Sequence, residues 1–359
     1  NKTAQGNQDS NDIGDFYYEP PTDFLALCTS NLPEPAVIPS EHFNTILYTG
    51  NNTANTAITG AGFQPDLVYI KSRSSAGSSN IYDAVRGVSA GNLTSNATAA
   101  DSGNADNFTS FDSDGFTLPA DTGGYNNYNS RTYAAWCWNA PTTASGTTTG
   151  SGTGKAYSAR YNTDAGFSIV TYKGNGTSGH TIPHHLSVAP RVVLVKNRDS
   201  ASPWPMLHLG MGHNGRIHLD QATVGYNDNN CWESDPTSSV FDLATTSDVN
   251  GNDADYIAYI WHDVDGYSKM GSYTGNGNVD GPFVYTGFRP AFIMLKESNN
   301  TSNWPMFDNK REGYNQENNY SYANVSNAEN NVVKIDMLSN GFKIKERSSS
   351  GVDSDNNTT

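Results

Sequence analysis

The chain has 359 residues and a formal net charge of −15, with 35% hydrophobic, 11% aromatic and 16% charged residues. This acidic balance argues against binding to nucleic acid or to an anionic membrane through a basic surface. No apolar run approaches the roughly 18 residues needed to cross a bilayer. The remaining composition, rich in Gly, Asn, Ser, Thr and Tyr, is typical of an all-β protein with short strands and long polar loops.

Residues 1–42 share no motif with the rest of the chain. They contain two proline clusters around a single short apolar run. Proline restricts both itself and the residue before it to extended backbone. We therefore expect residues 1–42 to be the end of a preceding domain followed by an extended connector.

From residue 43 onward, one set of motifs occurs three times. A proline is followed six residues later by a lysine in GFQPDLVYIK, SVAPRVVLVK and GFRPAFIMLK. A Tyr-X-Gly-Asn motif precedes each proline by 17, 18 and 17 residues, and a second apolar segment ends twelve residues after each lysine. The positions are Pro65 and Lys71, Pro190 and Lys196, and Pro290 and Lys296. Offsets this regular indicate an internal repeat.

Each copy is predicted to be a β unit. The continuous apolar runs 67–70 and 292–295 predict strands covered on both faces. Proline can open such a strand because its first residue need not donate to the ladder, and the lysine marks the exit from the core. Closing strands follow at 131–138 and 255–262, with small and aromatic residues mixed. We predict tandem antiparallel β-sandwiches of the jelly-roll or concanavalin-like type, with little helix.

The repeats are expected at residues 43–140, 167–263 and 264–359. The stretch over residues 141–166 is rich in Gly, Ser and Thr, so it is predicted to be a flexible linker. The third copy lacks its closing strand, which should begin about 16 residues after Phe342. Either the natural protein continues, or another segment or subunit supplies that strand.

Trp204 and Trp304 are the candidate ligand-binding residues. Each precedes a Pro-Met pair at the start of the second apolar segment of its copy, where prolines would hold the indole rigid. A rigid aromatic face can stack on a sugar ring. The alternative is structural: each tryptophan covers a sandwich edge or contacts the neighbouring repeat.

Two clusters contain residue types that can bind a metal. Asp248, Asn250, Asp253 and Asp255, in DVNGNDAD, offer hard oxygen ligands for calcium, although the segment also fits an ordinary polar hairpin tip. His180, His184 and His185 lie within six residues but have no neighbouring carboxylate or cysteine, so they are expected to be surface histidines. We therefore predict no cofactor and no bound metal, and the four residues of DVNGNDAD stay candidates for calcium.

Catalytic patterns are weak in the sequence. A Gly-X-Ser-X-Gly match occurs once, in GVSAG at residues 87–91, but no Ser-His-Asp spacing accompanies it, and there is no phosphate-binding loop. The carboxylates Asp112 and Asp114 could serve a glycosidase, but the third copy has Leu338 and Asn340 at the matching positions. We expect the chain not to be an enzyme.

The motifs YTGN, GFQPDLVYIKSR, SFDSDGFTL and TYAAWCW, followed by GSYTGNGNVDGPFVYTGFRPAFIMLK, resemble a repeat region in large structural proteins of tailed phages, notably marine phages. GDFYYEPPTDFLALCTSNLPEP is similar to the exit from a SPRY-type, concanavalin-like domain in such proteins. The resemblance covers nearly the whole chain. It implies a virion component, such as a tail fibre, an appendage or a capsid-surface fibre, and it transfers no catalytic residue.

The resemblance leads us to expect a structural and adhesive protein on the surface of the virion. Its partners would be other virion proteins and a host cell-surface glycan, and phage fibres imply a homo-oligomer, namely a trimer. Weak contacts would gain strength from multiple copies. Two alternatives stay open: a carbohydrate-binding module of a larger enzyme, and a capsid decoration protein without a receptor role.

Overall fold

The computed structural model describes residues 3–31, 37–312, 315 and 317–345. The chain divides into two compact units, Asn1–Val37 and Ile38–Thr359. The N-terminal unit holds one isolated bridge, between Asn7 and Phe16, and a short 3₁₀ turn, η1 (Thr29–Asn31). The unit boundary therefore falls at residue 37, a few residues before the predicted end of the connector at residue 42.

The second unit is all-β with antiparallel sheets, as predicted. Its helical segments, within the described residues, are 3₁₀ turns of three residues each. These are η2 (Pro39–Glu41), η3 (Val88–Ala90), η4 (Ala105–Asn107) and η5 (Leu209–Met211). None of the described helical segments is long and apolar enough to span a membrane.

Repeat 1 comprises strands β1–β8, arranged as a five-stranded sheet (β1-β8-β3-β4-β5) and a three-stranded sheet (β2-β7-β6). Side chains from both sheets form one core around Tyr82, Phe116 and Tyr133. The strands are β1 (Phe43–Thr49), β2 (Thr56–Thr59), β3 (Leu67–Ser72), β4 (Ser79–Asp83), β5 (Leu93–Thr94), β6 (Ser110–Asp112), β7 (Gly115–Leu118) and β8 (Thr132–Trp138).

Repeat 2 comprises β9–β19 and has the same plan, with an eight-stranded sheet (β17-β16-β15-β14-β19-β12-β11-β9) and a three-stranded sheet (β10-β13-β18). Tyr172, Trp232 and Phe241 lie in its core. The strands are β9 (Thr142–Thr147), β10 (Thr149–Gly150), β11 (Ala156–Asn162), β12 (Phe167–Lys173), β13 (His180–Pro183), β14 (Val192–Asn197), β15 (Pro205–His208), β16 (Gly215–His218), β17 (Tyr226–Asn227), β18 (Val240–Leu243) and β19 (Asp255–Trp261).

The predicted linker over residues 141–166 is wrong, because β9, β10 and β11 lie within it. β9 pairs with β11, and β11 pairs with β12 along six residue pairs. Threonine is β-branched and favours strands wherever a sheet edge is available for pairing. The low hydrophobicity of this stretch reflects an exposed sheet edge and not a disordered chain.

Repeat 3 comprises β20–β25 in one six-stranded sheet (β20-β25-β24-β23-β22-β21). Its core contains Phe307, Tyr320, Ile335 and Phe342. The strands are β20 (Phe283–Tyr285), β21 (Phe292–Met294), β22 (Pro305–Asp308), β23 (Glu317–Tyr322), β24 (Asn330–Leu338) and β25 (Gly341–Ile344). The jelly-roll or concanavalin-like type predicted for the repeats stays a prediction.

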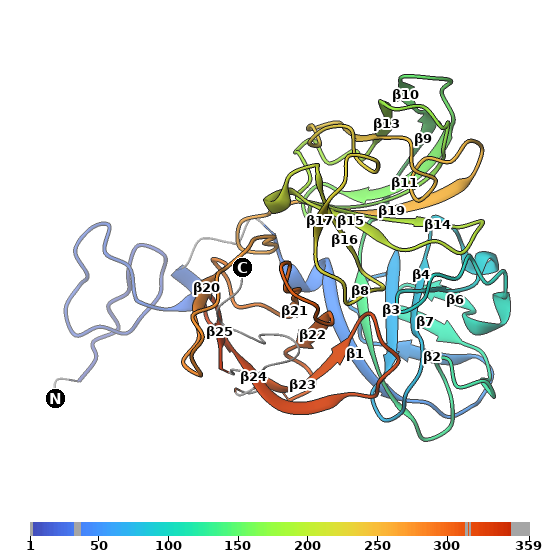
Figure 1. Ribbon diagram of the computed structural model, residues 1–359. Helices are drawn as coiled ribbons and strands as arrows, with labels where there is room; N and C mark the ends of the chain where they lie inside the picture. Colours follow the sequence, from blue (N-terminus) through green and yellow to red (C-terminus); the bar gives the residue numbers. More distant parts are fainter. Residues whose placement is uncertain (1–2, 32–36, 313–314, 316, 346–359) are drawn as a thin grey trace. The chain divides into compact units, whose positions relative to one another are not determined.

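A further core joins the three repeats. Leu67, Trp136, Ile169, Trp204 and Trp304 belong to a single cluster of buried side chains, and this cluster draws on β strands of every repeat. Figure 1 shows the three groups of strands around a common centre, coloured blue to cyan, green to yellow and orange to red. β3 is therefore covered on both faces, as its continuous apolar run predicted, and β14 is covered in the same way. The same prediction for residues 292–295 is wrong, because Phe292 and Met294 on β21 are only partly buried.

Candidate functional site

The candidate ligand-binding residue Trp204 is buried where repeat 2 contacts repeat 1. Its side chain is fully enclosed, with 0% exposure. The indole N–H donates to the backbone oxygens of Thr94 and Ala97, each at 3.1 Å. Both acceptors belong to repeat 1, so this tryptophan joins two repeats.

Trp304 occupies the equivalent position in repeat 3 and contacts repeat 2. It is 4% exposed, and its indole N–H donates to the oxygens of His218 and Gln221 at 2.9 and 3.1 Å. A sugar cannot stack on an indole whose faces are covered by protein. The prediction that Trp204 and Trp304 bind ligand therefore does not fit this structure, whereas the structural alternative does.

A matching pair of backbone hydrogen bonds occurs at each of the three contacts between repeats. In every case the loop after the repeated lysine pairs with a loop of the neighbouring repeat. Between repeats 2 and 1, Ser202 N donates to Thr98 O and Asp101 N donates to Arg198 O. Between repeats 3 and 2, Ser302 N donates to Ala222 O and Gly225 N donates to Ser298 O. Between repeats 1 and 3, Gly77 N donates to Ser326 O and Glu329 N donates to Arg73 O, and all six distances are 2.7–3.0 Å. Repeat 2 thus contacts repeat 1, repeat 3 contacts repeat 2, and repeat 1 contacts repeat 3. The three repeats close a ring with approximate threefold symmetry.

Lys71 and Lys196 do not leave the core, as the sequence suggested, but take part in these contacts. Lys296 Nζ instead donates within repeat 3, to Ser302 Oγ at 3.3 Å and Asn300 O at 3.4 Å. Lys71 and Lys196 are 1% and 0% exposed, and Lys196 Nζ donates to Thr98 O of repeat 1 at 2.9 Å. Burial lowers the pKa of Lys71, Lys196 and Lys296 to about 8 in each case. A buried ammonium group without a carboxylate partner relies on backbone oxygens for its solvation.

The contact that closes the ring differs in one respect. Repeat 1 has Ser79 where the other repeats have tryptophan. Lys71 Nζ donates to Ser79 Oγ and to Val325 O of repeat 3, both at 2.9 Å. By position in the repeat, Val325 corresponds to Ala97 and Gln221, whose oxygens accept from the indoles. The lysine therefore supplies the donor that the missing tryptophan would have provided.

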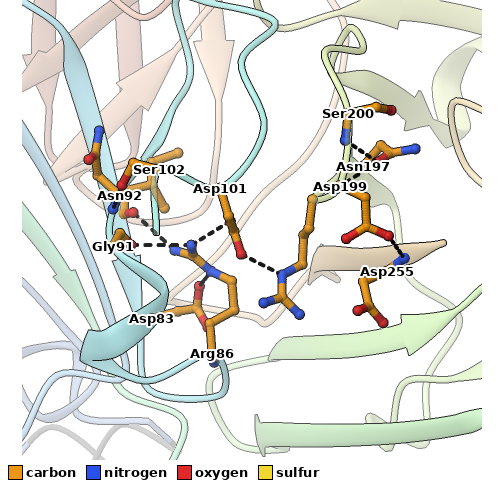
Figure 2. Close-up of polar contacts among 12 residues, drawn as sticks. Asp83, Arg86, Gly91, Asn92, Asp101, Ser102, Asn197, Asp199, Ser200 and Asp255 are labelled. Atoms are coloured by element: carbon orange, nitrogen blue, oxygen red, sulfur yellow. Dashed lines mark hydrogen bonds and ion pairs between the residues drawn. The ribbon is translucent and has the colours of Figure 1, made fainter. Parts of the chain in front are cut away.

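Buried ion pairs strengthen the contact between repeats 1 and 2. Figure 2 shows Arg86 between Asp83 and Asp101. The side chains of Arg86 and Asp83 are both 0% exposed, and Asp101 also accepts from Arg198 of repeat 2 at 2.8 Å. One carboxylate thus bridges guanidinium groups from two repeats. Charge-assisted hydrogen bonds of this kind are stronger than neutral ones.

The same network recurs where repeat 1 contacts repeat 3. Arg311 pairs with Asp308 at 2.7 Å and with Glu329 at 3.1 Å, and Arg73 of repeat 1 pairs with Glu329 at 2.9 Å. Neither network was predicted from the sequence. The available signal was an Asp-X-X-Arg spacing directly after the second strand, in DAVR and DNKR. Repeat 2 has His208 at the aspartate position.

The closing strands add one further contact between repeats. Tyr259, on β19 of repeat 2, donates its hydroxyl to Asp83 Oδ2 of repeat 1 at 2.9 Å. Trp136, on β8 of repeat 1, donates its indole N–H to Asp308 Oδ2 of repeat 3 at 3.1 Å. The two donors occupy equivalent positions on equivalent strands. Each closing strand thus connects its own repeat with the next.

The four calcium candidates do not converge on one point. Asn250 is 0% exposed, and its amide group is used in bonds such as that from Nδ2 to Ala244 O at 2.7 Å. The three carboxylates each have their own cation: Asp248 pairs with Arg216, Asp253 with Lys155 and Asp255 with Lys173. The residues that the structure describes contain no group of three or more His, Cys, Asp or Glu arranged for a metal. The calcium prediction does not fit this arrangement.

Two of the three histidines of HTIPHH are not surface residues, and the third, His185, is partly exposed. His180 and His184 are both 0% exposed. His180 Nε2 lies 2.6 Å from Thr148 Oγ1, and His184 Nε2 lies 3.1 Å from Thr237 O. Burial lowers the pKa of His184 to about 4, so this side chain is neutral at neutral pH. These imidazoles serve as neutral hydrogen-bonding groups inside repeat 2.

A groove lies at the contact between repeat 3 and the other two repeats. Its volume is about 1150 Å³, and it is mainly apolar. Aromatic and methionine side chains from all three repeats line it, including Phe43, Trp138, Phe167, Trp261, Phe292 and Met294. A concave, mainly apolar surface of this kind is a candidate binding site.

The model of a family described as a domain of unknown function (DUF7483) matches residues 38–358. The chain belongs to this family. The match begins at the residue where the second compact unit begins, Ile38. The DUF7483 domain therefore includes all three repeats, which agrees with a ring whose members share one core. No curated protein and no solved structure matches the chain.

Proposed function

We propose that this DUF7483 protein is a structural and adhesive component of a phage virion, displayed at the particle surface. One observation carries the proposal: the residues repeated between units serve to hold the units together. The tryptophans, the lysines and the Asp-X-X-Arg motifs all lie at contacts between repeats. A protein built in this way is a rigid body, which suits a projecting or connecting part of a particle. The resemblance to phage structural proteins supports the same conclusion.

Contact with a host glycan would use exposed aromatic side chains, because the tryptophans are enclosed. Tyr125 and Tyr128 are 41% and 38% exposed and lie three residues apart in repeat 1. The guanidinium of Arg131 lies 4.3 Å from the centre of the Tyr128 ring, which restrains that ring. A restrained tyrosine presents apolar area at low entropic cost, and several copies on a particle would add avidity.

The virion role is tested on purified particles. Mass spectrometry should detect the chain after density-gradient purification, and gold-labelled antibody against residues 38–345 should bind the particle surface. Antibody labelling at a fibre or tip would fit adhesion, whereas labelling spread over the capsid would fit a decoration protein. If the chain is absent from purified particles but present in the infected cell, the proposal is wrong.

Glycan binding is tested with host polysaccharide and the purified protein. Tyr125→Ala and Tyr128→Ala should each lower binding, whereas Tyr285→Ala, at a 66% exposed tyrosine in repeat 3, is the matched control. Binding without any presence on the particle would favour a carbohydrate-binding module. Release of reducing sugar would show that the protein is an enzyme.

Light scattering tests the trimer that the resemblance to phage fibres implies, because a trimer requires three times the mass of one chain.

A further inference from the structure

Repeat 3 differs from the other repeats at one edge of its sheet. In repeat 1, β3 lies between β4 and β8, and in repeat 2, β14 lies between β15 and β19. The equivalent strand of repeat 3 is β21, which pairs with β22 and ends the sheet among the described residues. No described strand of repeat 3 therefore occupies the position that a closing strand occupies in repeats 1 and 2.

The open edge presents backbone groups for pairing. Leu295 N donates to Pro305 O, and Asn309 N donates to Ala291 O, each at 3.1 Å. Because alternate residues of an antiparallel strand bond to the same neighbour, Phe292 and Met294 direct their N–H and C=O groups away from β22. An edge of this kind is a template for adding a strand.

The apolar side chains at this edge are less covered than their counterparts. Phe292 and Met294 are only partly buried and line the groove. The residues at the same repeat positions are 4–8% exposed: Leu67 and Tyr69 in repeat 1, and Val192 and Leu194 in repeat 2. The counterparts are covered in part by their paired closing strands, β8 and β19. The groove thus extends to the edge of β21, at the position where β8 and β19 pair with their strands in repeats 1 and 2.

We propose that this groove is the acceptor site for one antiparallel β-strand, a polypeptide segment with the alternating small and aromatic side chains of β8 and β19. The strand would pair with β21 and place its aromatic side chains among those of the groove. This inference follows from the internal symmetry of the ring and does not depend on a virion role.

The symmetry also specifies one side-chain contact. Tyr259 and Trp136 bond to Asp83 and Asp308, so the equivalent residue of the added strand would face His208 of repeat 2. His208 lines the groove, and its Nδ1 accepts from Gly210 N at 3.1 Å. A neutral imidazole with an accepting Nδ1 carries its proton on Nε2. The facing group must then accept a hydrogen bond, which a tyrosine hydroxyl can do and an indole cannot.

The test uses the full chain and a synthetic peptide with the sequence of residues 254–262, ADYIAYIWH. Calorimetry should show one site with micromolar affinity, and hydrogen exchange should show new protection at Phe292 and Met294. Saturating peptide should raise the thermal midpoint by mass action. A peptide of residues 131–139, RTYAAWCWN, should bind more weakly, because its first tryptophan, equivalent to Trp136, occupies the position that faces His208.

Two variants separate the contributions of backbone and side chain. Met294→Pro removes an edge N–H that no neighbouring strand uses, so the fold should persist while peptide affinity falls at least about tenfold. A peptide with phenylalanine in place of its second tyrosine should bind the wild type about fivefold more weakly. That difference should vanish with His208→Ala.

Three results would overturn the proposal. The first is no peptide binding at concentrations up to about 1 mM. The second is binding that Met294→Pro leaves unchanged, which would place the peptide elsewhere. The third is a fatty acid that fills the groove with higher affinity than the peptide and displaces it, which would make the groove a small-molecule site.

Discussion

Replacement of Trp204 by phenylalanine tests whether the contacts between repeats stabilise the fold. The substitution keeps an aromatic ring but removes the N–H that donates to Thr94 O and Ala97 O. The two oxygens lose this donor at a partly buried contact, which costs about 1–3 kcal/mol. The smaller ring leaves a cavity that costs about 1 kcal/mol more. The free energy of unfolding should therefore fall by about 2–4 kcal/mol.

Trp232→Phe is the matched control. Trp232 is 1% exposed and lies in the core of repeat 2, but its indole N–H has no hydrogen-bond partner among the described residues. Only the cavity contribution of about 1 kcal/mol applies there. Urea unfolding followed by circular dichroism gives both free energies from the midpoints and slopes. Equal losses in the two variants, within about 0.5 kcal/mol, would refute the argument that the indole bonds join the repeats.

Three further predictions concern buried polar groups. His184 has a folded-state pKa of about 4, below its ordinary value of 6.5, so its contribution to stability is complete above pH 6.5 and is lost as the pH falls toward 4. Urea unfolding at pH 8 and at pH 4 should show that the free energy of unfolding falls by about 2–3 kcal/mol, and His184→Gln should reduce this loss. Arg311→Met removes the cation paired with a buried carboxylate and should lower the free energy of unfolding by about 3–5 kcal/mol. Lys269→Met, at an exposed ion pair, is the control and should lower it by under about 1 kcal/mol. Equal losses in urea unfolding would contradict the stabilising role of the buried network. Native protein should react with a thiol reagent at Cys28 and not at the other two cysteines, which are buried and whose pKa values burial raises; rapid labelling of all three would mean that the cores open readily.

Local patterns in the sequence were sufficient for the fold class and the repeat. The spacing from Pro65 to Lys71 and its two later copies mark β3, β14 and β21 correctly as equivalent strands. The continuous apolar run of β3 predicted coverage on both faces, and this holds because its second face packs into the core shared by the repeats. The same prediction fails for β21, where Phe292 and Met294 are only partly buried. Period and composition act over a few residues, so they can be read without knowing the neighbours.

Features that depend on contact with a distant part of the chain could not be predicted from the local sequence. Trp204 and Trp304 have the sequence features of an exposed stacking platform, yet each is covered by a different repeat. The stretch 142–147 is polar enough for a linker, but β11 pairs with it. The histidines His180 and His184 are buried because loops from elsewhere in repeat 2 enclose them.

The sequence by itself therefore determined that this protein is a threefold-repeated, acidic, antiparallel β protein, because strand periodicity and repeat offsets are properties of local sequence. Only the tertiary structure decided that the repeats close a ring, that Lys71 replaces a missing tryptophan at one contact, and that β21, whose missing closing strand the repeat pattern predicted, borders an apolar groove. These features depend on which surfaces meet across more than 200 residues of chain, as in the bond from Lys71 to Val325. Burial and hydrogen bonding at such contacts arise from the packed arrangement and have no signature in a single segment.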